Sequence, residues 1–347
     1  RALIIFLTAL LCLCKVGLGA SPIAWEKGPS IPDEHGFAGP FAGVSSGTLV
    51  VAGGANFPDS FPWEGGSKVW HDRIFLLPEG AKEWTVSKVR LPKALAYGVS
   101  VSLPDQNHSI VMLGGSDAEN KPVADVNILT LKLVDARPEV FLQSLPPLPV
   151  ALAESSGLVV NNKIYIFSGR STDGTVRKAF RLDFGSQTLK WEELPWPEGA
   201  RGRMHSVAGS HDGKIFLFGG RDYQSDYEIE HPEDRLEAEK LDFLRDCYQF
   251  DPNTGKWVRI ADLPQGSSAS PYRAIPSGSS HLLMLGGVTA PYVEEQLKAR
   301  PEINGQGHEH PGFPRTVLAY HVITDTWVEA GALPPEMDVP VTVPVVF

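Results

Sequence analysis

The sequence predicts an all-β fold, a six-bladed β-propeller, on the basis of three recurring features. The first is an apolar strand that ends in a glycine pair, the second is a strand with an aromatic residue, and the third is an aliphatic residue followed by proline. They recur along the chain with a spacing of about 40–50 residues, which is typical of propeller repeats. Closing such a ring of sheets removes exposed strand edges.

The glycine pairs follow the apolar runs LVVA, IVML, IFLF and LLML. A strand without polar alternation suits a position that is buried on both faces, as between two blades. Two successive glycines permit positive φ angles and a close backbone approach where the strand turns. The pairs are Gly53-Gly54, Gly114-Gly115, Gly219-Gly220 and Gly286-Gly287, with Ser168-Gly169 as a variant.

The aromatic and proline positions complete each repeat. A large aromatic side chain fills the gap between adjacent sheets, and a proline ends an outer strand where a missing N–H costs little. The aromatic residues are Trp84, Phe141, Trp191, Trp257 and Trp327, and the closing pairs are Leu91-Pro92, Leu145-Pro146, Leu194-Pro195, Leu263-Pro264 and Leu333-Pro334.

The two ends of the chain predict the sixth blade. Trp25 and Ile31-Pro32 repeat the aromatic and closing features without a glycine pair before them, and residues 341–347 read as an inner strand. We therefore expect the N-terminal strand, residues 23–30, to close a sixth blade that is incomplete at the C-terminus, with about 25–40 residues missing. An open five-bladed arrangement is the alternative.

Several segments carry a resemblance to a known family. They are residues 37–43 (FAGPFAG), 53–58 (GGANFP), 62–66 (PWEGG), 70–72 (WHD) and 96–100 (AYGVS). Together with the repeats, they resemble the kelch-type N-acetylneuraminate epimerases, also called sialic acid mutarotases, in their circularly permuted branch. The resemblance covers residues 23–347.

The resemblance implies an isomerase without a cofactor, which acts on N-acetylneuraminate or a related acidic sugar. It would interconvert anomers by general acid/base opening and closure of the sugar ring. The family's catalytic element, Gly-Glu followed six residues later by Arg, would fall beyond Phe347, so no catalytic residue is assigned. The alternative is a non-catalytic kelch propeller that binds a glycan or a protein, because one fold serves many functions.

Candidate substrate-binding residues follow from where propellers bind ligands, around the central axis. The segments before the inner strands contain Phe37 and Glu154, and the candidates are Asn56, Tyr97, Arg203, His205, Tyr272 and Arg273. The arginines would hold a carboxylate, and the tyrosines would contact a sugar. Alternatively, arginine and histidine bridge blades through backbone carbonyls. Asn56 either donates to a sugar hydroxyl or adopts a left-handed turn.

Residues 1–20 read as an export signal, with a basic start, a short apolar run and small residues before Ser21. A membrane anchor is the alternative, but the run is short for a bilayer. Residues 21–347 would be one periplasmic or secreted domain. Removing Arg1 and Lys15 with the signal lowers the formal net charge from −10 to −12, which argues against nucleic acid and anionic membrane as partners. The sequence does not indicate an oligomeric state.

Two insertions interrupt the repeats, at residues 222–246 and 289–315. The first is acidic and contains a short amphipathic helix at 232–244, and the second contains His308-Glu309-His310. Neither spacing predicts a metal site. Cys247, on a predicted strand, is expected to be a buried and inert thiol.

Overall fold

The computed structural model describes residues 26–60, 65–103, 105–106, 108–134, 137–223, 243–269, 273–289, 291–292 and 314–334. The predicted signal at 1–20, residues 232–242 of the predicted helix and His308-Glu309-His310 lie outside these ranges. Within them, no helix is long and apolar enough to cross a membrane.

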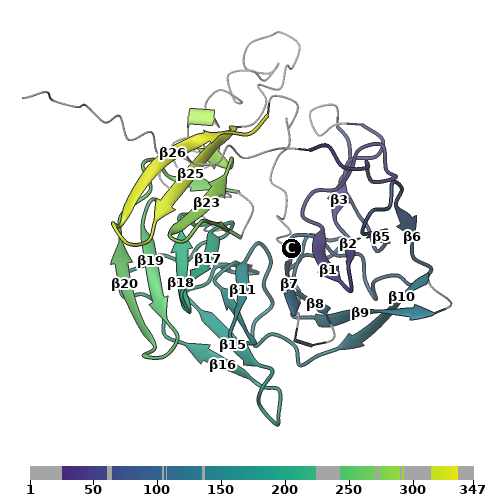
Figure 1. Ribbon diagram of the computed structural model, residues 1–347, viewed down its shortest axis with the longest axis horizontal. Coiled ribbons are helices and arrows are strands. Elements are labelled where there is room, and N and C mark those ends of the chain that lie inside the picture. Colours follow the sequence, from purple (N-terminus) through teal and green to yellow (C-terminus); the bar gives the residue numbers. More distant parts are fainter. Residues whose placement is uncertain are drawn as a thin grey trace, which may run out of the picture.

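Five four-stranded antiparallel sheets form the blades of a β-propeller (Figure 1). Blade 1 contains β1 (Phe41–Ser45), β2 (Thr48–Ala52), β5 (Ile74–Pro78) and β6 (Thr85–Val86). Blade 2 contains β7 (Val99–Leu103), β8 (Ser109–Leu113), β9 (Val126–Val134) and β10 (Arg137–Ser144). Blade 3 contains β11 (Ser156–Val160), β12 (Lys163–Phe167), β15 (Ala179–Asp183) and β16 (Trp191–Leu194). Blade 4 contains β17 (Val207–His211), β18 (Lys214–Phe218), β19 (Cys247–Asp251) and β20 (Lys256–Ile260). Blade 5 contains β22 (Ile275–Ser277), β23 (His281–Leu285), β25 (Thr316–His321) and β26 (Thr326–Ala332).

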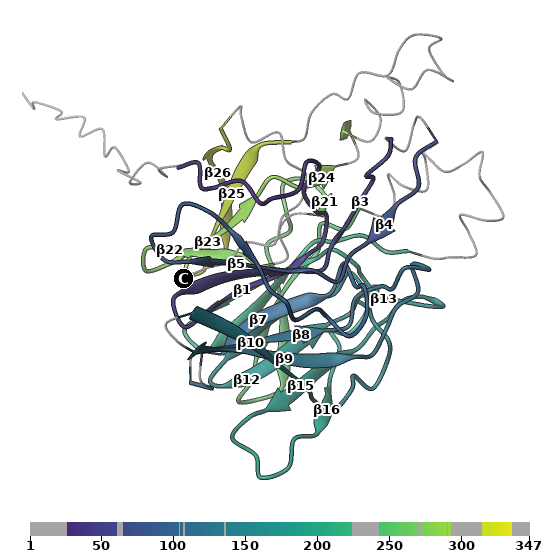
Figure 2. The ribbon, with the colours of Figure 1, turned by 90° about the vertical axis from the view of Figure 1, so that its right-hand side faces the viewer.

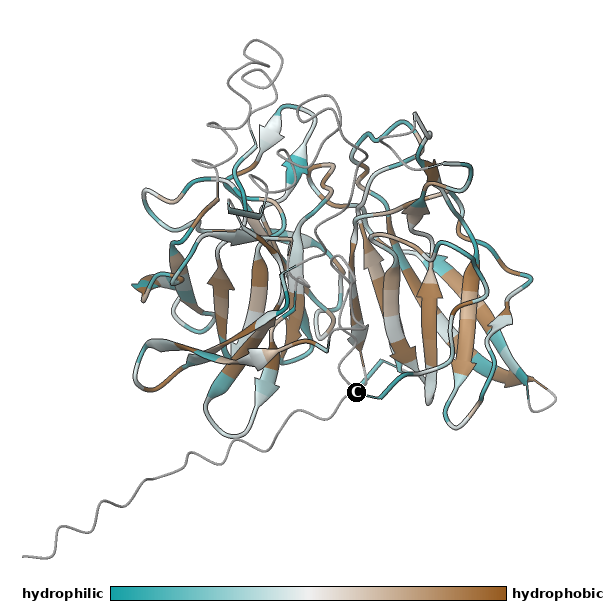
Figure 3. Ribbon diagram, turned by 90° about the horizontal axis from the view of Figure 1, so that it is seen from above, coloured by the Kyte–Doolittle hydropathy of each residue, from teal (hydrophilic) through white to brown (hydrophobic). Residues whose placement is uncertain are grey.

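The core lies between neighbouring blades, as the continuous apolar strands predict. β8 is buried along its whole length, and Val99, Val111 and Leu113 of blade 2 pack in one cluster with Ile166 and Phe180 of blade 3. Figure 3 shows hydrophobic residues concentrated in the strands and hydrophilic ones in the loops. Cys247 is buried, as predicted, and burial raises its thiol pKa to about 12, which disfavours the reactive thiolate.

The glycine pairs adopt the positive φ angles that the sequence predicts, for example +65° at Gly53 and +93° at Gly54. After the pairs, the chain leaves the blade on one side of the ring and forms short hairpins, among them β3 (Ala55–Asn56) with β4 (Val69–Trp70) and β13 (Arg170–Ser171) with β14 (Gly174–Thr175) (Figure 2). β21 (Ser267–Ser268) pairs similarly with β24 (Val288–Thr289).

The closing leucines pack against the first glycine of each pair. A side-chain carbon added at Gly53 would lie 3.0 Å from Leu91, and one at Gly219 would lie 2.6 Å from Leu263. In blade 2, the residue in this position is Leu148, which is 3.2 Å from the equivalent point at Gly114. The prediction of Leu145-Pro146 as the closing pair is therefore corrected to the next leucine-proline pair along the chain.

The tryptophans link each blade to the one before it by a hydrogen bond that the repeat pattern did not predict. The indole N–H of Trp191 donates to the carbonyl of Pro146 (3.0 Å), and that of Trp257 donates to Pro195 (2.7 Å). Trp327 donates in the same way to Ala261 (3.0 Å). Phe141, which has no N–H, stands in this position in blade 2 and is 44% exposed.

The prediction of six blades is wrong for the described chain, which forms five. Residues 341–347 and 23–25 lie outside the described residues, and residues 26–30 form no strand because no described strand lies beside them as a hydrogen-bonding partner. The N-terminal segment nevertheless takes the place of a preceding blade's outer edge, since the Trp84 indole donates to the carbonyl of Pro29 (2.9 Å).

Replacing Trp257 with phenylalanine should lower the free energy of unfolding by about 0.5–1.5 kcal/mol, the usual contribution of one hydrogen bond. Phenylalanine keeps an aromatic ring beside Phe250, which lies 4.8 Å from Trp257 between centroids, and removes the indole N–H that donates to Pro195. Urea denaturation measures it. The control is Val258→Ala on the same strand, where the side chain is 56% exposed and the change should be under about 0.5 kcal/mol. Equal stability of W257F and the wild type would contradict the role of the link.

Candidate functional site

A row of left-handed residues encircles the inner end of the blades. The first four members each lie two residues before the inner strand of a blade, and the fifth lies at the matching point of the last repeat. Their φ angles are between +52° and +60°, and the members are Gly39, Tyr97, Glu154, His205 and Ala269. Each backbone N–H donates to the carbonyl of the previous member, over 2.7 Å from Tyr97 to Gly39, 2.7 Å from Glu154 to Tyr97 and 2.8 Å from His205 to Glu154. Tyr97 and His205, two of the candidates from the segments before the inner strands, belong to this row.

Two arginines reach the same region from the residue after the glycine pair. Arg170 pairs with Ala153, and Arg221 pairs with Met204, in equivalent antiparallel bridges. These bridges place each arginine next to a member of the row, because Ala153 precedes Glu154 and Met204 precedes His205. The other repeats have small or aliphatic residues at this point, namely Ala55, Ser116 and Val288.

Arg170 holds Glu154 in a two-point ion pair. Its Nε donates to one carboxylate oxygen (2.7 Å) and its Nη2 donates to the other (3.2 Å). The same guanidinium donates to the backbone carbonyl (3.3 Å) and the side-chain oxygen (3.1 Å) of Asn120. The two charged side chains are only 13% and 12% exposed, so the two-point contact with Arg170 fixes the orientation of the Glu154 carboxylate.

Lys68 adds a third cation from the residue before β4. Its ammonium lies 4.7 Å from the centre of the Tyr97 ring and 5.6 Å from those of Phe57 and Trp70. Such contacts hold an ammonium in place without neutralising its charge. The Lys68 ammonium is therefore held among the rings of Phe57, Trp70 and Tyr97.

His205 lies within electrostatic reach of all these groups. Burial lowers the pKa of its imidazole, and the charges of Arg221, Arg170 and Lys68 lower it further, while Glu154 acts in the opposite direction. The imidazole is therefore neutral at pH 7. Among the described residues no hydrogen bond engages its ring nitrogens. We refer to Lys68, Glu154, Arg170, His205 and Arg221 as the axial cluster. Within the described ranges of the chain it brings together three basic side chains and the Glu154 carboxylate, in a chain with a formal net charge of −10.

Asn56 lies in a different network, which ties the N-terminal segment to blade 1. Its amide nitrogen donates to Asp33 (3.1 Å) and to the carbonyl of Gly36 (2.8 Å), and its amide oxygen lies 2.8 Å from Nε2 of His71. It does not have a positive φ. In the structure Asn56 therefore forms hydrogen bonds within the protein, in place of the expected contact with a sugar hydroxyl or the expected left-handed turn. Phe37 packs nearby against the His71 ring, 5.0 Å between centroids.

Arg203 is fully buried and bridges blades 3 and 4. Its guanidinium donates to the Asp246 carboxylate (2.7 Å) and to the carbonyls of Gly219 (3.1 Å) and Asp246 (3.2 Å). Its own backbone N–H donates to the Ser168 hydroxyl (2.8 Å). With an exposure of 0%, the side chain has the packing role that the sequence left open as the alternative.

Of the two remaining candidates, only Arg273 belongs to the part of the chain that the structure describes. Arg273 forms a parallel bridge with Ala208 between blades 4 and 5. Tyr272 lies outside the described residues.

The sequence did not identify Lys68, Arg170 or Arg221 as site residues. A signal was present for the arginines, because the position after the glycine pair is arginine in only two of the five repeats. No local signal marks Lys68, whose place depends on the register of the β3–β4 hairpin.

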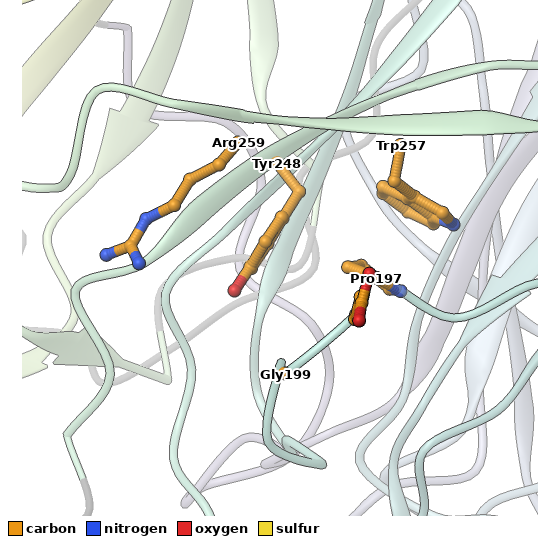
Figure 4. Close-up of a pocket in the computed structure, with 6 residues that line it drawn as sticks. Pro197, Gly199, Tyr248, Trp257 and Arg259 are labelled. Atoms are coloured by element: carbon orange, nitrogen blue, oxygen red, sulfur yellow. The ribbon is translucent and has the colours of Figure 1, made fainter.

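A separate groove of about 260 Å³ lies between the loop that follows β16 of blade 3 and strands β19 and β20 of blade 4 (Figure 4). It is lined by Pro197, Glu198, Gly199, Tyr248, Trp257 and Arg259. Three of its polar groups already have partners: the Tyr248 hydroxyl donates to Asp246 (2.7 Å), the Trp257 indole donates to Pro195 (2.7 Å) and the Arg259 guanidinium pairs with Asp262 (2.9 Å). The axial cluster is therefore the better candidate.

Comparison with known proteins supports the fold. The family model of the KLHDC2/KLHL20/DRC7 Kelch-repeats domain matches residues 42–287. A solved structure described as "Structure of YjhT" has a TM-score of 0.61 and 15% sequence identity, covering 85% of this chain and 84% of that one.

Sequence relatives include N-acetylneuraminate epimerases. The one from Salmonella enteritidis PT4 (strain P125109) is 34% identical over 125 residues, which is 32% of this chain and 31% of the relative. The one from Haemophilus influenzae (strain PittEE) is 30% identical over 206 residues, which is 55% of this chain and 50% of the relative. The chain thus spans between about a third and a half of the length of these relatives.

Proposed function

We propose that this chain, which belongs to the Kelch-repeat family of β-propellers, interconverts the anomers of N-acetylneuraminate or a related acidic sugar. The observation that carries the proposal is the axial cluster, in which the charges of Lys68, Arg170, Arg221 and Glu154 all act on His205 and Arg170 pairs with Glu154. Basic side chains gathered at one point of an acidic chain attract an anionic ligand to that point. The similarity to proteins named N-acetylneuraminate epimerase supports a sugar acid as that anion.

The chemistry of the cluster suits such a substrate. Arginine binds a carboxylate through two parallel hydrogen bonds, while lysine contributes a point charge. Tyr97, whose ring holds Lys68, offers an aromatic face to a sugar ring. Because anomer exchange needs only proton transfer at the anomeric hydroxyl and the ring oxygen, the proposed reaction needs no cofactor. We also propose that the protein is exported and acts in the periplasm or outside the cell.

The direct test is NMR of freshly released α-N-acetylneuraminate, which follows anomer exchange with and without the full-length protein as its gene encodes it. Faster exchange than in buffer is expected. Saturable binding of the sugar without any acceleration would instead indicate a non-catalytic kelch propeller that binds a glycan. Neither binding nor acceleration would rule out this sugar.

Replacing Lys68 with methionine should weaken binding of N-acetylneuraminate about tenfold. A hydrogen bond to a charged group contributes about 1.5–3 kcal/mol, part exposure reduces this, and tenfold in affinity corresponds to about 1.4 kcal/mol. Calorimetric titration measures the dissociation constant. The matched control is Lys256→Met, which removes an exposed lysine on the outer strand β20 and should leave affinity unchanged. Equal affinities of the two variants would contradict the role of Lys68.

A further inference from the structure

The groove between blades 3 and 4 has an aromatic wall whose two rings are fixed. Tyr248 on β19 and Trp257 on β20 project from blade 4 toward the loop that follows β16 (Figure 4). Their rings meet edge to face, with centroids 6.4 Å apart and planes at 89°. The Trp257 indole donates to the carbonyl of Pro195 (2.7 Å), and the Tyr248 hydroxyl donates to Asp246 (2.7 Å). The wall is therefore pre-organised, which lowers the entropic cost of binding a ligand.

The opposite wall of the groove is a tight turn. The N–H of Ala200 donates to the carbonyl of Pro197 (3.1 Å), and Gly199 supplies the positive φ of +72° within the turn. The Trp196 indole donates to the carbonyl of Ala200 (3.2 Å), and its ring lies 6.2 Å from that of Trp257. The space between the two walls, about 260 Å³, is smaller than most sites for drug-sized ligands. It suits a ligand with a single six-membered ring.

The charged residues of the groove select against ions of either sign. Glu198 is exposed on the turn, and Arg259, opposite Tyr248 in the sheet, is 61% exposed and pairs with Asp262 (2.9 Å). Both side chains line the groove, so Glu198 repels an anion and Arg259 repels a cation. A neutral ligand with hydroxyl groups fits both residues, because a hydroxyl donates to a carboxylate and accepts from a guanidinium.

We propose that this groove binds a neutral pyranose sugar, free or as one unit of a glycan, at a site separate from the axial cluster and independently of the proposed function. One face of a pyranose ring consists of C–H groups, which pack on the rings of Tyr248 and Trp257. The hydroxyls at its edge both donate and accept, as Glu198 and Arg259 require. A proline-rich peptide also packs on aromatic rings, but its prolines have no N–H to donate to Glu198.

The test is an NMR titration of the full chain labelled with ¹⁵N in its eight tryptophans. Trp257→Phe and Trp327→Phe identify the indole signals of these two residues by their absence. The ligands are the methyl glycosides of glucose, galactose, mannose and N-acetylglucosamine. At least one should shift the Trp257 signal saturably and leave that of Trp327 in place. The expected Kd is on the order of 1 mM, which follows from about 13 non-hydrogen atoms at an ordinary ligand efficiency.

Two variants test the roles of the charged residues. Glu198→Ala and Arg259→Met should each weaken binding of that glycoside about tenfold, as expected for the loss of a hydrogen bond to a charged group. The matched control is Glu329→Ala, which removes an exposed carboxylate from β26 of blade 5 and should leave the affinity unchanged. Equal binding of the glycoside and its free sugar would indicate a unit within a glycan, and binding of the free sugar alone a monosaccharide.

Three results would overturn the proposal. The first is the absence of a saturable shift of Trp257 with every glycoside and its free sugar at about 20 mM, roughly twenty times the expected Kd, including the case in which a proline-rich peptide shifts this signal instead. The second is an affinity that E198A and R259M leave unchanged. The third is displacement of the glycoside by N-acetylneuraminate, which would show that the two sugars share one site. Failure of the wild type to exchange anomers would overturn the proposed function and leave this site unaffected.

Discussion

Replacing Arg203 with methionine should lower the free energy of unfolding by about 3–5 kcal/mol, the usual cost of removing one partner of a buried ion pair. Arg203 is the largest fully buried side chain among the described residues. Its loss would leave the Asp246 carboxylate, which is 18% exposed, without its cation. It would also remove hydrogen bonds to the carbonyls of Gly219 and Asp246.

The pKa of Asp246 shows the strength of this pairing. Burial alone would raise it, but the Arg203 guanidinium and the hydrogen bonds from Arg203 and Tyr248 hold the pKa of this carboxyl below its usual range. A carboxyl whose pKa is lowered by folding stabilises the protein above its unfolded pKa of about 3.8, and that contribution is lost as the pH falls through the folded pKa. The destabilisation of R203M should therefore be largest near neutral pH and shrink in acid.

Urea denaturation at pH 7 measures the effect, and two comparisons separate its causes. Arg259→Met removes an arginine that is 61% exposed and paired with Asp262, and an exposed pair of this kind should cost at most about 1 kcal/mol. Adding Asp246→Asn to R203M removes the unpaired charge and should restore part of the stability. A loss in R203M no larger than that in R259M would show that the buried pair does not stabilise the blade junction.

The repeats were predictable from the sequence because their physical causes are local. A positive φ at Gly53 or Gly219 and an apolar strand before it depend on a few neighbouring residues. The closing leucine of blade 2 was not predictable in the same way, because Leu145 and Leu148 are both followed by proline. Only the packing of Leu148 against Gly114 distinguishes them.

The site was predicted in part for the same reason. Tyr97 and His205 precede inner strands, so the repeat placed them near the axis. Arg203 also precedes an inner strand, but in the structure its side chain turns into blade 4 to meet Asp246. The arginines that do join the axial cluster, Arg170 and Arg221, are placed by bridges to residues about 17 positions earlier in the chain, and the only sequence signal for them is that both follow a glycine-pair position of the repeat.

Replacing Gly53 with alanine should lower the free energy of unfolding by about 2–5 kcal/mol, through two separate causes. Its φ of +65° disfavours any side chain by about 1–2 kcal/mol. The added carbon would also lie 2.3 Å from the carbonyl oxygen of Leu95 and 3.0 Å from Leu91. The backbone of Leu95 cannot easily move away, because its carbonyl accepts the N–H of Gly54 (2.8 Å), so overpacking adds about 1–3 kcal/mol.

Gly255→Ala separates these two causes, because Gly255 has φ of +69° but nothing within 4 Å of the added carbon. G255A should lose only the free energy of unfolding that the positive φ costs. The additional loss in G53A, measured by urea denaturation, is then the cost of the close approach to Leu95 and Leu91. Blade 3 shows how a side chain is accommodated at this position: Ser168 has φ of +50°, and its hydroxyl accepts the Arg203 N–H (2.8 Å). The first position of the glycine pair therefore tolerates a side chain only where, as in blade 3, the neighbouring loop leaves room for it and forms a hydrogen bond with it. Equal losses in G53A and G255A would show that the loop of blade 1 moves aside and that the close packing of Leu91 and Leu95 does not require glycine.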